Sequence, residues 1–287
     1  MDAPTDMSRV ARRPDARRAG ADPARRGDVP WPLALPAVVT VGFLLLPLAG
    51  LLVRAPWRSL DRILAESQVV DALRLSLVCA GAATVLSLVF GVPLAWVLAR
   101  GRFRGRGLLR ALVALPLVLP PVVGGVALLL AFGRRGVVGQ HLDAWFGFTL
   151  PFTTLGVIVA ETFVAMPFLV ITVEGAFSGA DRGYEEAAAA LGASRLTVFR
   201  RVTLPLIGPS LVAGSVLCWA RALGEFGATV TFAGNFPGRT QTMPVAVYLA
   251  LERDPEAAIA LSLVLLAVSA AVLVGLRGRW LNTGSAA

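Results

Sequence analysis

The sequence contains no lysine, one histidine and two cysteines in 287 residues. Without lysine it has no G-x-x-x-x-G-K-[ST] loop, so it lacks the phosphate-binding loop of an ATPase. The lone His141 and the absence of H-E-x-x-H make a membrane-embedded hydrolase a poor interpretation. Cys79 and Cys218 lie inside apolar segments, which predicts small buried hydrophobic residues and neither a disulfide nor a metal site.

Apolar residues dominate the rest of the chain. Hydrophobic residues make up 56% of the sequence and the mean hydropathy is +0.72, which indicates an integral membrane protein. The net charge of +9 comes from arginines placed between apolar runs, and this placement favours membrane topology over nucleic-acid binding. Residues 1–30 have almost no large apolar side chain, so we expect a disordered cytoplasmic tail.

Six apolar runs are long enough to cross a bilayer, which predicts an all-α polytopic membrane protein. The runs are Leu33–Val53, Leu75–Leu98, Ala111–Phe132, Thr153–Val173, Ser210–Phe232 and Ala257–Leu276. With both termini inside, 18 arginines lie on the cytoplasmic side and 8 outside, as the positive-inside rule requires. We therefore divide the chain into the tail, a first helix with its outer loop (31–71), a core (72–276) and a cytoplasmic tail (277–287).

Proline and glycine interrupt the third predicted span, at Leu115-Pro116, at Leu119-Pro120-Pro121 and at Gly124-Gly125. Breaks of this kind leave backbone carbonyl groups without partners, which is tolerated only where protein or a water-filled path covers them. The interruption is typical of a translocation pathway, but a kink that only improves helix packing fits equally well.

A polar, arginine-rich segment at about 178–205 separates two of the spans. Asp181 is placed to cap a first short helix, and Gly192 to end it in a left-handed conformation. Ser194 is placed to cap a second helix, which Pro205 is expected to close. A helix pair of this size buries too little surface to be stable alone, so we expect it to dock on a partner.

Three ionisable residues fall inside predicted spans. Arg221 and Glu225 are four residues apart and so share one helix face, and Glu161 lies within the fourth span. Charges at this depth usually face the bundle interior or a cavity. One interpretation is that Arg221 attracts a passing oxyanion while Glu225 holds it in place. The other is a structural ion pair of Arg221 with Glu225 or Glu161.

The loop at 234–242 is the second candidate functional segment, because it is rich in hydrogen-bond donors and glycine. Its candidate pathway or gate residues are Asn235, Arg239, Thr240, Gln241 and Thr242. They are suited to contacting an extracellular partner, although a solvated turn between two spans has the same composition.

The spacing of Glu186-Ala187-Ala188, Gly192 and Leu204-Pro205 resembles the ATPase-coupling loop of type I ABC importer permeases. Two further runs, Arg221–Thr229 and Gly238–Thr242, resemble the molybdate/tungstate branch of that family more narrowly. The resemblance extends from about residue 72 to residue 276.

The resemblance implies a homodimer in the bacterial plasma membrane. It implies two cytoplasmic ABC ATPase subunits, which bind ATP and Mg²⁺, and an extracytoplasmic oxyanion-binding protein. The chain itself would bind no cofactor and would not be an enzyme. Sulfate or thiosulfate import is the closest alternative, and a membrane scaffold is a more distant one.

Overall fold

The structure is a computed structural model that describes residues 31–281, with side chains from 31 to 275. Every regular element in these residues is helical, as predicted. The chain forms two compact units, residues 1–50 and residues 51–287. Most of α1 (Trp31–Val53) belongs to the first unit, and it contains Pro36 and Pro47. The tail predicted to be disordered, residues 1–30, lies outside the described residues.

The described residues contain four helices that are long and apolar enough to cross a membrane, by length and composition. There are up to six if each of two bent helix pairs counts as one span. The four are Trp31–Val53, Ser67–Arg100, Thr154–Gly179 and Pro255–Gly275. The predicted number of spans therefore depends on how the bent pairs lie in the bilayer.

The helix Ser67–Arg100 is continuous for 34 residues. It consists of α3 (Ser67–Leu86), a π-helical turn η2 (Ser87–Gly91) and α4 (Val92–Arg100). Pro93 is the second residue after the π-turn. In a regular α-helix a proline ring clashes with the carbonyl group four residues earlier, and the wider π-turn accommodates it without a break.

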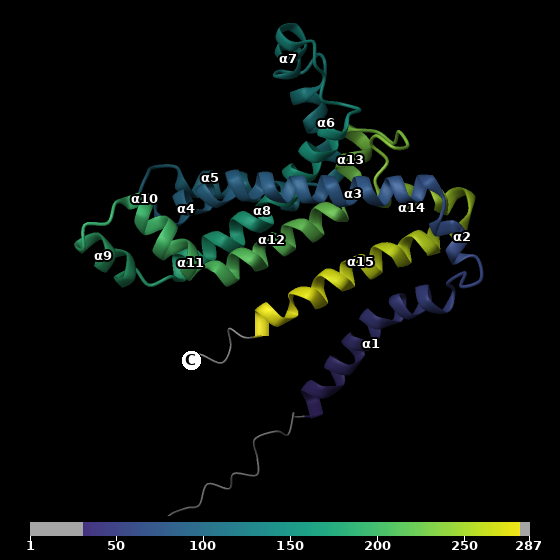
Figure 1. Cartoon of the computed structure of the whole chain (residues 1–287), viewed down its shortest axis with the longest axis horizontal. Helices are drawn as coiled ribbons and strands as arrows, with labels where there is room; N and C mark the ends of the chain where they lie inside the picture. Colours follow the sequence, from purple (N-terminus) through teal and green to yellow (C-terminus); the bar gives the residue numbers. More distant parts are fainter. Residues whose placement is uncertain (1–30, 282–287) are drawn as a thin grey trace, which may run out of the picture. The chain divides into compact units, whose positions relative to one another are not determined.

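The centre of the second unit is α8 (Thr154–Gly179), which buries twelve residues. It packs against α3, α4 and α12 (Gly208–Leu223), and Figure 1 shows these helices running side by side. The main apolar cluster joins Leu98, Leu169, Val173 and Phe177. Both cysteines are buried and free, which confirms the predicted packing role.

Two of the predicted spans are not single helices. Ala111–Phe132 is divided into α5 (Arg106–Val118) and α6 (Pro121–Phe132), which are bent by 117°. The break follows from Pro120 and Pro121, because the residue before a proline is driven out of the helical region. Leu119 accordingly has an extended backbone.

The predicted span Ser210–Phe232 is not one continuous helix either, because α12 ends at Leu223 and a separate helix, α13 (Gly227–Phe232), follows it. The side chain of Glu225 stabilises this break, since its Oε1 accepts a hydrogen bond from the amide of Ala228 at 2.8 Å. Gly224 was the sequence signal for the interruption, and hydropathy alone did not detect it.

Helices α6 and α13 lie very close together because glycine is present on both sides of their contact. A Cβ atom added to Gly125 would lie 2.7 Å from Thr231 Cβ and 3.0 Å from the Ala228 carbonyl oxygen. A Cβ atom added to Gly227 would lie 2.9 Å from Pro121 Cβ. Small residues at such contacts allow the backbones of membrane helices to approach closely.

Gly125→Val is expected to destabilise the protein by about 1–3 kcal/mol, the usual range for overpacking a close contact. Gly107→Val is the matched control, because Gly107 is also helical but has nothing within 4 Å of the added Cβ. The measurement is the midpoint of thermal unfolding in detergent. Equal midpoints for the two variants would contradict the close contact of α6 and α13.

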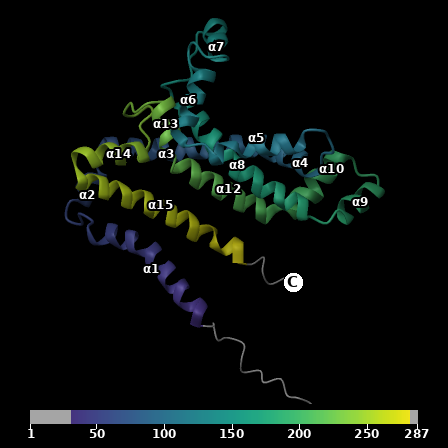
Figure 2. The same cartoon turned by 180° about the vertical axis from the view of Figure 1, so that it is seen from behind.

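The remaining helices lie at the ends of the second unit (Figures 1 and 2). One end holds α9 (Gly183–Ala190), α10 (Arg195–Val198), η3 (Phe199–Thr203) and α11 (Leu204–Leu206), beside the end of α4. The opposite end holds α2 (Leu60–Leu64) and α14 (Met243–Arg253), where α15 (Pro255–Leu281) begins. The short helix α7 (Gly139–Phe146) follows α6.

Candidate functional site

The first helix of the predicted coupling loop, α9, begins and ends close to the predicted residues. It starts at Gly183, and Asp181 Oδ1 accepts a hydrogen bond from the Gly183 amide at 2.8 Å, although the cap position itself is Arg182. Gly192 has a φ of 83°, which confirms the left-handed stop. The amide of Gly192 donates to Ala189 O and that of Ala193 to Ala188 O, so the helix ends in a Schellman motif.

The second helix of the predicted coupling loop begins as predicted but continues one residue beyond Pro205. Ser194 Oγ accepts a hydrogen bond from the Thr197 amide at 3.3 Å and caps α10. Pro205 does not close the helix, which continues through η3 and α11 to Leu206. The π-turn at Phe199–Thr203 precedes the proline and accommodates its ring. The chain then bends by 74° into α12.

The predicted coupling residues are mostly on the surface of this end of the molecule. Glu186, Ala187 and Pro205 are exposed, whereas Ala188 and Leu204 are half-buried. Around them, Tyr184 is 61% exposed and Leu191 at the tip is 90% exposed. Exposed large apolar side chains beside polar ones are typical of a protein-binding surface.

Glu185 is the residue of this loop that the sequence analysis missed. Its Oε1 lies 3.0 Å from Arg100 Nη2, and it accepts a hydrogen bond from Thr203 Oγ1 at 3.2 Å. Arg100 Nη2 also lies 3.5 Å from the carbonyl oxygen of Ala180. The available signal was an acidic residue in the loop together with an arginine at the end of a span, both on the predicted cytoplasmic side.

Arg221 and Glu225 form an ion pair, with 2.6 Å between Arg221 Nη2 and Glu225 Oε2. The Glu225 side chain is 1% exposed and that of Arg221 is 27% exposed. Glu161 is also buried, but within the described residues it has no ion pair, and its Oε2 has no hydrogen-bond partner. The structure therefore pairs Arg221 with Glu225 and not with Glu161.

The candidate residues of the polar loop at 234–242 differ in their exposure to solvent. Asn235 and Arg239 are exposed, Gln241 is half-buried, and Thr240 and Thr242 are buried. Thr240 Oγ1 accepts a hydrogen bond from the Phe236 amide at 2.9 Å, so this side chain shapes the loop from inside. Only the exposed pair is placed to meet a large partner.

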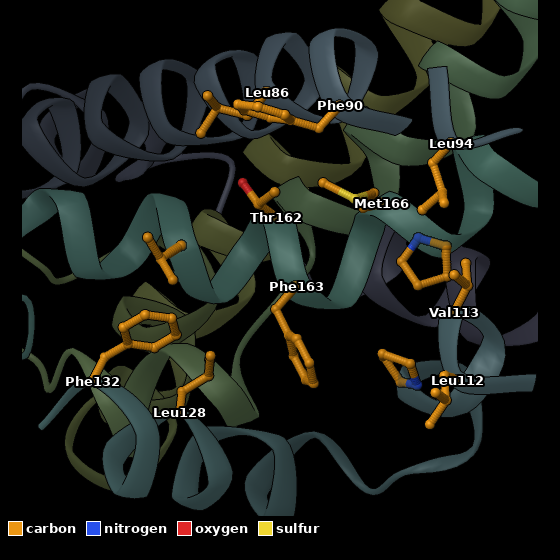
Figure 3. A pocket seen from close by; sticks show the side chains of 13 residues that line it. Leu86, Phe90, Leu94, Leu112, Val113, Leu128, Phe132, Thr162, Phe163 and Met166 are labelled. Atoms are coloured by element: carbon orange, nitrogen blue, oxygen red, sulfur yellow. The ribbon is translucent and has the colours of Figure 1, made fainter. Parts of the chain in front are cut away.

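An apolar cavity of about 360 Å³ is lined by residues of α3, η2, α4, α5, α6 and α8 (Figure 3). Phe90, Leu112, Phe163 and Met166 are among its lining side chains. Thr162 is its only polar lining residue, and its hydroxyl group donates to Ile158 O at 2.6 Å. No charged residue lines the cavity, so it offers an oxyanion neither positive charge nor an uncommitted donor.

Residues 91–283 match the family described as binding-protein-dependent transport system inner membrane component. This match covers more than half of the chain and includes the coupling loop, α12 and α13. The chain belongs to this family of membrane permease subunits.

Particular relatives match this chain over most of their length. The chain is 49% identical over 252 residues to the molybdenum transport system permease protein ModB of Mycobacterium bovis, covering 88% of this chain and 95% of the relative. It is 41% identical over 234 residues to the sulfate transport system permease protein CysT of Salmonella typhimurium, covering 80% and 84%. In fold it is similar to a chain of a bacterial alginate ABC transporter solved with a periplasmic protein. The TM-score is 0.71 at 18% identity, covering 85% of this chain and 91% of that one.

Proposed function

We propose that the chain is the membrane permease subunit of an ATP-driven importer of molybdate or tungstate. The observation that carries this proposal is the coupling loop, whose first helix ends at Gly192 and leaves Glu186 and Leu191 exposed. Molybdenum permease proteins as much as 49% identical over nearly their whole length support the substrate class.

A homodimer of this chain would receive substrate from an oxyanion-binding protein on the outer face. Two ATPase subunits would bind the coupling loops from the cytoplasm, and both termini of the chain would lie on that side. Arg100 contacts the coupling loop, and Arg102, Arg104 and Arg106 follow it in the sequence, which supports a cytoplasmic location for this end. Since the sequence has no phosphate-binding loop, ATP and Mg²⁺ would be bound by the partner ATPase.

ATP-driven closure of the ATPase pair would push the two coupling loops together. The movement would rock the permease subunits between inward-open and outward-open states. The permease needs no tight anion site of its own, because a pathway that bound its ion tightly would not release it.

Sulfate import is the second candidate, because a sulfate permease protein is 41% identical to this chain. Selectivity in such a system would reside mainly in the binding protein. The two candidates therefore differ in which loaded binding protein stimulates the complex.

The test is the ATPase activity of the complex reconstituted in lipid vesicles with the binding protein loaded with molybdate, tungstate or sulfate. We expect molybdate and tungstate to stimulate hydrolysis and sulfate not to. The binding protein without substrate is the control. Stimulation by sulfate alone would overturn the substrate assignment, and failure to copurify any ATPase would overturn the proposed function.

A further inference from the structure

We propose that Glu185 is a positioning residue for transport, which joins the coupling helix α9 to the long membrane helix that ends at Arg100. The proposal rests on the proposed function, since it concerns how movement of the coupling loop reaches the membrane helices. It assigns distinct roles to adjacent acidic residues: Glu185 binds within the chain, and Glu186 remains available to the ATPase.

Two residues from other segments contact the Glu185 carboxylate, and one of them, Arg100, also reaches a third segment. Arg100 is the last residue of α4, and its Nη2 lies 3.0 Å from Glu185 Oε1. The same nitrogen lies 3.5 Å from the carbonyl oxygen of Ala180, which follows the last residue of α8. Thr203, the last residue of η3, donates its hydroxyl hydrogen to Glu185 Oε1 at 3.2 Å. The carboxylate therefore connects α9 directly with α4 and η3, and through Arg100 with the end of α8; we call this set of contacts the Glu185 junction.

Apolar packing does not hold α9 in place. None of its residues is buried. A hollow of about 400 Å³, lined by Trp96 and Phe199 among others, lies beside Glu185. Because α9 has so little packed surface, the Glu185 junction is its principal side-chain connection to the membrane helices.

The junction is shielded from solvent more than an ordinary surface ion pair. The Arg100 side chain is 9% exposed and that of Glu185 is 21% exposed. Removal of Glu185 would leave a nearly buried guanidinium group without its counter-charge, and its Nε already has no hydrogen-bond partner. The adjacent Glu186 differs, because it is exposed and its carboxylate has no ion pair within the described part of the chain.

The helix that ends at Arg100 reaches the opposite end of the second unit (Figure 1). Its 34 residues correspond to roughly 50 Å at 1.5 Å per residue. Near its start, Ser76 Oγ accepts a hydrogen bond from the amide of Met243, the first residue of α14. A displacement of α9 that moves Arg100 therefore acts on a single helix, and the same helix contacts α14 through Ser76.

The experiment uses the full complex of permease, ATPase and binding protein in vesicles. Glu185→Ala removes the carboxylate without loss of helix propensity. We expect it to copurify the ATPase and to keep basal hydrolysis, while substrate transported per ATP falls about tenfold, within the usual range of coupling between sites. Arg100→Ala is expected to behave in the same way. The reversed pair, Arg100→Glu with Glu185→Arg, is expected to recover most of the coupling ratio.

Two control variants test whether the effect is specific to the Glu185 junction. Arg102→Ala removes an exposed arginine two residues from Arg100 and is expected to leave the coupling ratio unchanged. Glu186→Ala is expected to weaken copurification of the ATPase, which Glu185→Ala should not do. If Glu185→Ala does not accumulate in the membrane, Glu185→Gln keeps the shape of the side chain and is judged by the same criteria.

Three results would overturn the inference: an unchanged coupling ratio in Glu185→Ala, a loss that the reversed pair does not recover, or a loss of ATPase binding in Glu185→Ala. In each case the wild-type complex would still transport substrate, so the proposed function would stand. A wild-type chain that binds no ATPase would instead remove the proposed function itself.

Discussion

Arg221→Met is expected to destabilise the protein by about 3 kcal/mol, toward the lower end of the range for breaking a buried ion pair. The substitution leaves the Glu225 carboxylate, which is 1% exposed, without the guanidinium group 2.6 Å away. The Arg221 side chain is 27% exposed, so the remaining Glu225 charge can be partly solvated. We therefore expect a loss of stability of about 3 kcal/mol, the lower end of the range. The measurement is the midpoint of unfolding in detergent.

The double variant Arg221→Met, Glu225→Gln is expected to recover most of this loss. It removes both charges, and the glutamine oxygen can still accept the hydrogen bond from the Ala228 amide that begins α13. Arg200→Met is the control, because Arg200 is exposed and outside the pair. A wild-type midpoint for Arg221→Met would show that the pair does not stabilise the fold.

Substrate uptake by the same double variant separates the two interpretations of Arg221. The guanidinium group is neutralised by Glu225, so the pair presents no net charge to a passing anion. We therefore expect a stable double variant to transport at a rate close to that of wild type. A stable double variant with uptake reduced more than about tenfold would instead assign Arg221 to the pathway.

Local signals in the sequence predicted much of the coupling loop. Gly192 and Ser194 act through their own backbone conformation or through an amide three residues away, so their roles can be inferred from nearby residues. The ion pair of Arg221 with Glu225 was one of two pairs that the sequence left open, but the predicted shared helix face was wrong, because Glu225 lies beyond the end of α12. Hydropathy similarly predicted the helical membrane class.

The features that were missed depend on contacts between distant segments or on non-standard helical turns. Pro205 normally ends a helix, and only the π-turn before it explains why the helix continues to Leu206. The 117° bend between α5 and α6 was indicated as an interruption, but its direction is fixed by the close contact of Gly125 with α13. Glu185 binds Arg100, 85 residues away along the chain, which no local pattern reveals.

Gly192→Val is expected to reduce the affinity of the chain for the proposed ATPase partner about tenfold or more, with a similar loss of uptake. The φ of 83° lies in the left-handed region, which costs a residue with a Cβ atom about 1–2 kcal/mol and a β-branched one more. The Schellman hydrogen bonds from Gly192 and Ala193 depend on this conformation, so the end of α9 and the exposed Leu191 would change position. If the unbound loop relaxes, binding must restore the strained conformation at Gly192. Since 1.4 kcal/mol corresponds to a factor of ten in binding, this strain accounts for most of the expected loss of affinity.

Gly179→Val is the matched control for this substitution. Gly179 is the last residue of α8, has nothing within 4 Å of an added Cβ, and has no positive φ. Both variants should insert into the membrane and unfold at similar temperatures, because the coupling loop contributes little to the core. The two should then differ in the amount of ATPase that copurifies and in uptake. Equal uptake by both would mean that the left-handed stop at Gly192 does not determine how the coupling loop meets the ATPase.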